Sequence, residues 1–267
     1  QTPIYLIVFN RVDALRQLVV WLESSGYENI HIIDNASTYP PLLEYLEATP
    51  HTVHIMDRNY GHLVLWESGK FGEVIDHHNF VLSDCDILPA ETCPADVVGR
   101  LAEILKRYPN FTKVGLSLLI DDIPDHYAFK ASVQEWEAPF WDHPLENGAL
   151  YEAAIDTTFA YYRPGISPSD KRWWRSLRTA PPLAARHLPW YADTEKPTDE
   201  DLYYQSHLQE MSSQWSITDL TLLKKQNTKL QAEVYALRKD IEMLRAGRGA
   251  YFRHWARIKL VSFLDLV

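Results

Sequence analysis

Two carboxylates separated by one residue, Asp84 and Asp86, are the side chains of this chain best suited to chemistry. They directly follow the apolar run at residues 80–82, so a buried strand would deliver both of them to the edge of a sheet. Paired carboxylate oxygens favour Mg²⁺ or Mn²⁺, and such an ion neutralises a bound diphosphate. Asp-X-Asp is common by chance, and its place after a strand is what gives it weight here.

The elements that would position these carboxylates are predicted from apolar patterns. The continuous apolar run at residues 4–9 predicts a strand buried on both faces of a parallel sheet, and shorter strands are predicted at residues 30–33, 53–56 and 80–82. Helices are predicted over residues 13–25, 41–48 and 95–108, followed by a strand over 113–119. This order predicts an α/β fold with a doubly wound, mainly parallel, Rossmann-like sheet. Asn10, Asp34 and Asp84 fall where such sheets bind ligands, beyond the carboxyl ends of the strands.

This order of elements and the Asp84-X-Asp86 motif resemble the nucleotide-sugar domain of GT-A glycosyltransferases. The words Tyr-Leu-Ile-Val-Phe-Asn-Arg, Ile-Ile-Asp-Asn-Ala-Ser and Asn-Tyr-Gly-His are similar to family-2-like enzymes of bacterial and viral polysaccharide synthesis, including rhamnosyltransferases. The resemblance covers residues 3–120. It implies a GT-A fold in which Asp84 and Asp86 hold Mn²⁺ or Mg²⁺ on the donor diphosphate.

The resemblance also implies roles for residues outside that motif. Asp34 would contact the base or ribose, and His187 would be an extra metal ligand of the kind that some GT-A enzymes recruit late in the chain. The other donor contacts would come from Phe9, Asn10, Arg11, Asn59 and Gly61. We therefore divide the chain into a nucleotide-sugar half at 1–120 and an acceptor-side half at 121–198.

The acceptor-side half departs from the family's pattern. The usual Glu-Asp motif before a Gln-X-X-Arg-Trp helix is not evident, and residues 172–175 resemble it only loosely. An inverting transfer needs one carboxylate to take the acceptor proton. Asp156, beside a strand-like stretch at 154–162, is the first candidate, and Asp121 and Asp122 are the second. A capping role for Asp156 stays open.

Basic and aromatic residues in this half have two interpretations. The cationic side chains would meet a donor diphosphate or an anionic lipid-linked acceptor, or they form a solvated face: Lys171, Arg172, Arg175, Arg178 and Arg186. The tryptophans Trp136, Trp141 and Trp190 would stack on a sugar ring, or they pack in the core and rim.

A helical segment predicted over residues 199–246 contains a heptad repeat. Position a holds Leu220, Asn227, Val234 and Ile241, and position d holds Leu223, Leu230, Leu237 and Leu244. β-branched residues at a with Leu at d favour a parallel two-stranded coil, and a single Asn at a fixes its register. We predict a homodimer through this coil, with packing on the chain's own domain as the alternative.

The charge of the chain is unevenly distributed. Residues 1–219 carry 16 Lys+Arg and 32 Asp+Glu, a balance of −16, whereas residues 220–267 carry 10 and 4, a balance of +6. A basic tail on an acidic body favours an anionic membrane surface over nucleic acid, which the body would repel. Residues 247–267 mix aromatic, apolar and basic side chains, as helices in a membrane interface do.

Other features of the sequence concern its location. Only two cysteines occur, which favours a reducing compartment. No signal peptide is expected, and no run reaches the roughly 18 apolar residues of a spanning helix. We expect a cytoplasmic protein, peripheral on the inner face of the membrane.

Together these patterns predict an inverting, metal-dependent glycosyltransferase of hexosyltransferase type. The donor would be a UDP, dTDP or GDP sugar, and the acceptor a glycan or lipid-linked glycan. A sugar nucleotidyltransferase is disfavoured because no glycine follows the first strand to cradle a triphosphate. The alternative is a non-catalytic coiled-coil membrane scaffold with a degenerate transferase domain.

Overall fold

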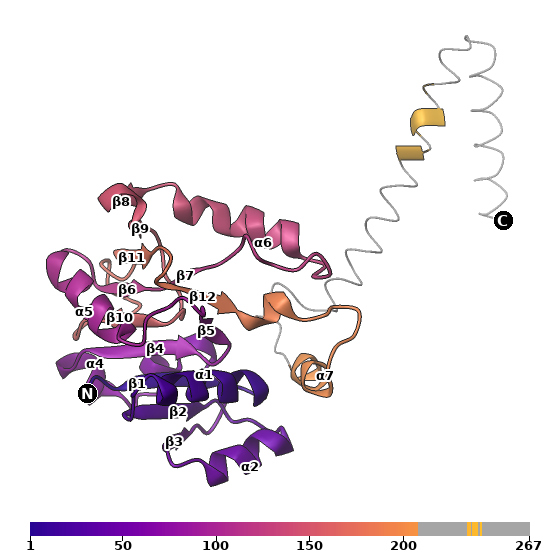
Figure 1. The fold of residues 1–267 in the computed structure, drawn as a ribbon. Coiled ribbons are helices and arrows are strands. Elements are labelled where there is room, and N and C mark those ends of the chain that lie inside the picture. The colour runs from indigo at the N-terminus through magenta and orange to yellow at the C-terminus, as the bar shows by residue number, and fades with distance from the viewer. Residues whose placement is uncertain (208–233, 236, 240, 242–267) are drawn as a thin grey trace, which may run out of the picture. The chain divides into compact units, whose positions relative to one another are not determined.

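A computed structural model describes residues 1–207, 234–235, 237–239 and 241. The chain divides into two units, Gln1–Ser213 and Gln214–Val267, and every element labelled in Figure 1 belongs to the first. In the second unit the described residues are helical. The remainder of the predicted coiled coil and the predicted membrane-interface tail at 247–267 lie outside the described residues.

The first unit is built on a sheet whose described part has nine strands in the order β3-β2-β1-β4-β10-β6-β11-β9-β8. In that order the strands are Thr52–Ile55, Ile30–Asp34, Ile4–Val8, Phe80–Asp84, Ala160–Tyr162, Lys113–Gly115, Ser176–Thr179, Leu150–Glu152 and Pro144–Leu145. Strands β10 and β9 run against the other seven. The structure is therefore α/β with a mostly parallel sheet, compatible with a Rossmann-like fold. Both predicted halves of the chain contribute to this one sheet. Strand β6, from residues 1–120, lies between β10 and β11, which come from residues 121–198.

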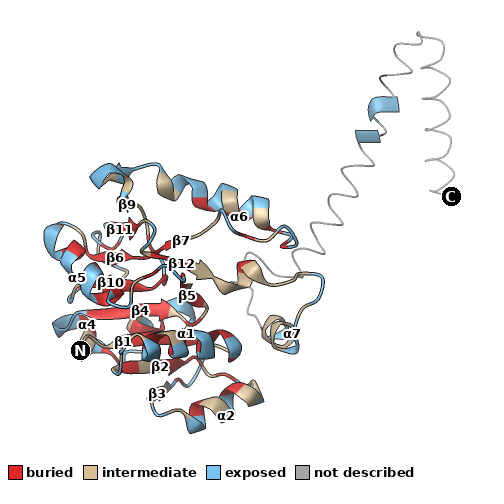
Figure 2. Cartoon of the chain, viewed as in Figure 1, coloured by how far each residue is buried: buried red, intermediate tan, exposed pale blue. Residues whose placement is uncertain are grey.

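Helices pack around this sheet through apolar stripes. The α-helices are α1 Asp13–Ser24, α2 Pro40–Ala48, α3 Val64–Glu67, α4 Gly72–His77, α5 Val97–Arg107, α6 Lys130–Glu137 and α7 Asp199–Ser206. The 3-10 turns are η1 Gly61–Leu63, η2 Ala138–Trp141, η3 Glu146–Gly148 and η4 Leu188–Tyr191. In α1, Leu15, Leu18 and Leu22 recur at helical spacing and are fully buried. Figure 2 shows buried central strands and helices whose outer faces are exposed.

Strands β4, β10 and β6 form the tightly packed centre of the sheet. Phe80 and Tyr162 stack across β4 and β10, with ring centroids 5.1 Å apart. Gly115 in β6 has no room for a side chain, since an added Cβ would lie 2.8 Å from the Ala160 Cβ. This close approach explains why a glycine is needed at this position of β6.

Two of the predicted strands are shorter than expected. The strand predicted over 113–119 divides at Leu116, so that β6 stays in the large sheet and β7 (Ser117–Leu118) enters a second one. The strand-like stretch at 154–162 becomes a strand only at Ala160, because residues 154–159 form the turn that crosses the sheet edge. The other two strands of the small sheet, β5 (Ile87–Pro89) and β12 (Ala184–His187), were not predicted.

The small sheet brings a distant segment to the Asp-X-Asp motif. Strand β12 pairs antiparallel with β5, with His187 opposite Ile87, and parallel with β7. The Leu188 amide then donates to the Asp86 carbonyl at 2.9 Å. Within the described residues no helix is long and apolar enough to cross a membrane.

Candidate active site

The predicted site residues gather at one edge of the large sheet. Strands β2, β1 and β4 are parallel neighbours, with Val8 opposite Asp34 and Ile7 opposite Asp84. Both carboxylates therefore lie at the carboxyl ends of their strands, where open α/β sheets bind ligands. The turn at 154–159 reaches the same edge, because the Asp84 amide donates to the Thr157 carbonyl at 2.8 Å.

Asp86 is the residue on which the site converges. Its Oδ2 lies 3.6 Å from the His187 Nε2 and 3.3 Å from an Arg11 guanidinium nitrogen. Burial alone would raise the pKa of Asp86, but the charge of His187, its hydrogen bond and the charge of Arg11 outweigh burial and lower the pKa to about 2. Asp86 is therefore ionised across the physiological range, and one carboxylate oxygen faces an imidazole nitrogen.

Asp84 has the opposite electrostatic character. Burial, and then the nearby charge of Asp86, raise its pKa well above the usual range of an aspartate. The Thr157 hydroxyl donates to its Oδ2, which only partly offsets this. The pKa values of these two neighbouring carboxylates are therefore shifted in opposite directions. A bound cation would stabilise the ionised form of both.

Two of the residues predicted to contact the nucleotide, Asn10 and Asp34, accept hydrogen bonds from backbone amides of the loop after β2. The Asn10 side chain is fully buried and accepts from the Thr38 and Tyr39 amides at 2.7 and 3.0 Å. Asp34, also buried, accepts from the Ser37 amide at 3.1 Å. These two residues shape the edge, and among the described residues the buried amide nitrogen of Asn10 has no hydrogen-bond partner.

The segment that carries Asn59 and Gly61 is tied to the end of β2. Asn35 donates to the Gly61 carbonyl at 2.9 Å and accepts from the Tyr60 amide at 3.3 Å. Gly61 has a φ of +67°, a conformation that side chains disfavour. The predicted donor segment thus lies beside the edge that holds Asp34.

Helix α7 contributes contacts that the sequence did not predict. Its Glu200 carboxylate accepts from the Val12 amide at 2.7 Å and from the Asp13 amide, at the N-terminus of α1. The Arg11 guanidinium lies over the Tyr204 ring, 3.9 Å from its centroid, and Phe9 packs edge-on against the same ring. The helix therefore fixes the loop that supplies the cation beside Asp86.

The predicted base, Asp156, is on the turn at this edge and is open to solvent. Its carboxylate is 71% exposed, and its Oδ1 lies 3.7 Å from the Nε2 of His62. The second candidate Asp122 instead accepts from Arg186 and from the Tyr191 hydroxyl, so it is committed to a surface network. Asp156 is the more available carboxylate of the two, and Asp121 is an exposed residue of the turn before Asp122.

The other basic and aromatic candidates are placed elsewhere. Arg178 is buried in an ion pair with Glu137 at 2.7 Å, and it supports α6 rather than a ligand. Lys171, Arg172 and Arg175 precede β11, at the amino edge of the sheet, so they do not reach a diphosphate bound beside Asp84. The aromatic candidates divide: Trp136 is 53% exposed, Trp141 packs on Tyr151, and Trp190 is buried against His187.

The carboxyl edge offers two converging ligands to a divalent ion. In the part of the chain that the structure describes, no group of three His, Cys, Asp or Glu side chains is arranged to hold a metal. Asp86 and His187 do converge as a pair, and no group in the described ranges bonds to the buried Nδ1 of His187. Mg²⁺ and related ions commonly use one or two protein ligands and complete their shell with substrate phosphates and water. The pair fits a metal that arrives with a diphosphate better than a resident one.

A scan against models of known protein families and a search of curated proteins gave no match to this chain. The functional argument therefore depends on the sequence motifs and on the geometry of this edge.

Proposed function

We propose that this protein is a metal-dependent glycosyltransferase that moves a sugar from a nucleoside diphosphate donor to a hydroxyl of a glycan or lipid-linked glycan. The observation that carries the proposal is the convergence of Asp86, His187 and Arg11 at the carboxyl edge of the sheet, beside Asp84. An oxygen–nitrogen donor pair with a neighbouring guanidinium suits a diphosphate and its metal ion.

Asp86 and His187 would hold Mn²⁺ or Mg²⁺, and Asp84 would add its negative charge nearby. When bound, the ion would offset the charge that develops on the departing nucleoside diphosphate. Arg11 already balances Asp86, and its fork of donors can turn to a phosphate oxygen when the donor enters. The stacking of Arg11 on Tyr204 keeps the guanidinium plane oriented for that contact.

Asp156 would act as the general base of an inverting transfer. Its carboxylate would take the proton of the acceptor hydroxyl as the hydroxyl oxygen bonds to the anomeric carbon. The bond from that carbon to the diphosphate oxygen breaks, and the nucleoside diphosphate leaves with the electron pair. The exposure of Asp156 supports this role, since an acceptor must reach it from solvent.

We also propose that the enzyme is a dimer held at the inner face of a membrane. This part of the proposal is based on the heptads at 220–246 and on the +6 balance of residues 220–267. A position at the membrane would favour a lipid-linked glycan as the acceptor, because the enzyme would encounter such a molecule at that surface.

The experiment is thermal unfolding of the full chain with UDP, dTDP and GDP, each with and without Mn²⁺. Because a ligand that binds the native state raises the midpoint by mass action, one nucleotide should raise it, and only when Mn²⁺ is present. Mn²⁺ alone should have little effect, since the protein supplies only two close ligands. Asp86→Asn should abolish the joint effect.

The matched control is Asp76→Asn, an exposed aspartate on α4 that should leave the nucleotide response intact. If no nucleotide shifts the wild-type midpoint with Mn²⁺ present, the transferase proposal fails. The non-catalytic scaffold would then be the better account of the coiled coil and tail.

A further inference from the structure

A pocket lies at the amino edge of the large sheet, at the opposite strand ends from Asp84. It has a volume of about 230 Å³ and is formed by the segments before β6, after β10 and before β11. Its lining residues are Pro109, Asn110, Phe111, Thr112, Arg163, Pro164, Ile166, Arg172 and Arg175. Three arginines and no acid line it, although the body of the chain is strongly acidic.

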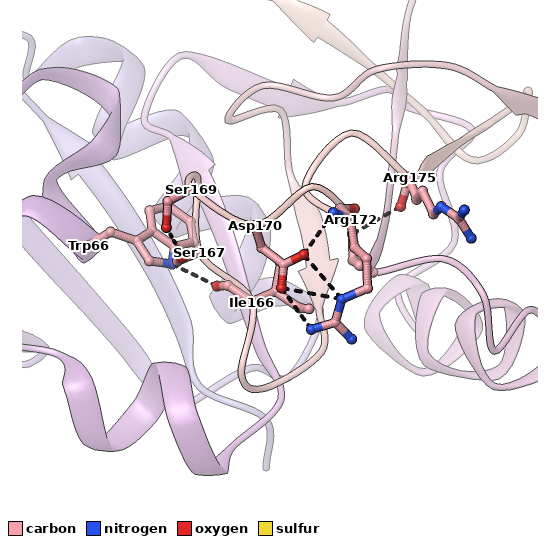
Figure 3. Close-up of polar contacts among 8 residues, drawn as sticks. Trp66, Ile166, Ser167, Ser169, Asp170, Arg172 and Arg175 are labelled. Carbon is pink, nitrogen blue, oxygen red and sulfur yellow. Dashed lines mark hydrogen bonds and ion pairs between the residues drawn. The ribbon is translucent and has the colours of Figure 1, made fainter.

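Two of these arginines are fixed in place. Arg163 donates through Nε to the Phe111 carbonyl at 2.9 Å and through Nη2 to the carbonyls of Leu105 and Tyr108 at the end of α5, so three hydrogen bonds hold it in one wall of the pocket. Arg172 donates two hydrogen bonds to the Asp170 carboxylate, from Nε at 3.1 Å and from a terminal nitrogen at 2.7 Å. Figure 3 shows this fork closed on the Asp170 carboxylate.

Arg175 is the uncommitted cation of the pocket. Its carbonyl accepts from the Thr112 hydroxyl at 2.9 Å, which fixes its backbone. Among the described residues no partner holds its guanidinium, which is exposed and, in Figure 3, points away from Asp170. A fixed backbone with a free guanidinium is well suited to an incoming anion.

The segment that carries Arg175 has one buried tryptophan, which packs against the core, and several exposed basic residues. Trp173 is buried, packs edge-on against Trp66 at 4.8 Å and lies under the Lys113 ammonium. Its neighbour Trp174 is 68% exposed. Residues 163–175 hold four basic residues and one acid, so this edge presents a local positive patch with an exposed indole.

We propose that this pocket binds a phosphate group, carried either by a small molecule or by a lipid headgroup. Arg175 would supply the free fork, Arg163 and Arg172 the surrounding positive field, and Asn110 a neutral donor. An exposed tryptophan beside basic residues is the composition found at membrane–water interfaces. The proposal is separate from the transfer reaction, because it uses residues at the other edge of the sheet.

The first arm of the test uses inorganic phosphate on the full chain, without divalent ions and at constant ionic strength. Phosphate should raise the unfolding midpoint of the wild type, and Arg175→Gln should weaken the apparent affinity about tenfold by removing one charge-assisted contact. Arg100→Gln, which removes an exposed arginine of α5, is the matched control and should leave the affinity unchanged.

The second arm uses sedimentation with phosphatidylglycerol vesicles, and with phosphatidylcholine vesicles as reference. If a lipid headgroup is the source, Arg175→Gln and Trp174→Ala should each lower retention on the anionic vesicles relative to Arg100→Gln. If Arg175→Gln and Arg100→Gln are retained equally on the vesicles, but only Arg175→Gln weakens the response to inorganic phosphate, the ligand is a phosphate group of a soluble molecule. If Arg175→Gln matches Arg100→Gln in both arms, the proposal is overturned, whatever the outcome of the Mn²⁺ and nucleotide experiment.

Discussion

At the scale of single residues, Lys113 is unexpected because an ionisable amine lies in the buried centre of the sheet. It is fully buried in β6, its Nζ donates no hydrogen bond to any residue that the structure describes, and this nitrogen lies 3.7 Å from the centroid of the Trp173 ring. Burial lowers its pKa from 10.5 to about 7, with Asp156 acting weakly in the other direction. The position is therefore costly to occupy with a charged amine.

We predict that Lys113→Met raises the free energy of unfolding by about 1–3 kcal/mol at pH 7. Between pH 7 and 10.5 the unfolded amine keeps its proton while the folded amine has lost it, so the stability of the wild type rises with pH. The difference between the two proteins should be largest at pH 7 and below, and small near pH 10.5. Urea unfolding across this range measures it.

Lys106→Met, on the exposed face of α5, is the control and should change stability by less than about 0.5 kcal/mol. A loss of stability in Lys113→Met at every pH would contradict the prediction. It would mean that the contact of the ammonium with Trp173 outweighs the cost of burial.

How much of the site could be predicted depends on sequence separation. Asp84 and Asp86 were placed at the sheet edge because an apolar strand directly precedes them, and the structure agrees. The contact of Glu200 with the Val12 amide joins residues 188 positions apart, and no local pattern encodes it. Lys113 was missed for a similar reason, since the aromatic rings around it come from separate segments of the chain.

At the scale of elements, helix α7 acts as a clamp on the start of α1. The first amides of a helix have no partner within it, and a carboxylate placed there is favoured by the helix dipole. Val12 offers no side-chain cap to α1, and Glu200 supplies the acceptor instead. The neighbouring Tyr203 hydroxyl donates to the Thr38 carbonyl at 2.9 Å, which ties α7 to a second loop of the site.

We predict that Glu200→Ala lowers the free energy of unfolding by about 1–2 kcal/mol, the usual cost of a lost helix cap. Glu200→Gln should lose less, since its amide oxygen still accepts although the charge is gone. Urea unfolding of both variants at pH 7 gives the comparison. Equal losses in the two variants would argue that packing of α7, rather than the hydrogen bonds to α1, is what matters.

The elements also differ in how predictable they were. Strands β1, β2 and β4 are mostly apolar and mostly buried, so their type and order followed from composition. Strands β5, β7 and β12 have two to four residues and pair across long gaps in the sequence. The pairing of such short, distant strands is determined by tertiary contacts rather than by local propensity, so the small sheet could not be predicted from the sequence.

At the scale of the whole molecule, the heptads at 220–246 predict that two chains associate. Most of that segment lies outside the described residues, but three of its predicted seam residues are described. Val234, Leu237 and Ile241 are helical, and 46%, 61% and 48% of their surface is exposed in the single chain. Apolar residues at a and d positions that keep about half of their surface exposed are those that a second helix would bury.

We predict that the full chain sediments as a dimer in analytical ultracentrifugation and that Leu230→Glu with Leu237→Glu makes it a monomer. Charges placed at two d positions cannot be buried in a coil without a large desolvation cost. The unfolding midpoint of the first unit should stay the same, since its sheet is complete within Gln1–Ser213. Lys225→Glu and Lys239→Glu, at positions predicted to face solvent, form the matched control and should remain dimeric. A wild-type chain that sediments as a monomer across the accessible concentrations would refute the parallel coil and favour packing of the helix on its own chain.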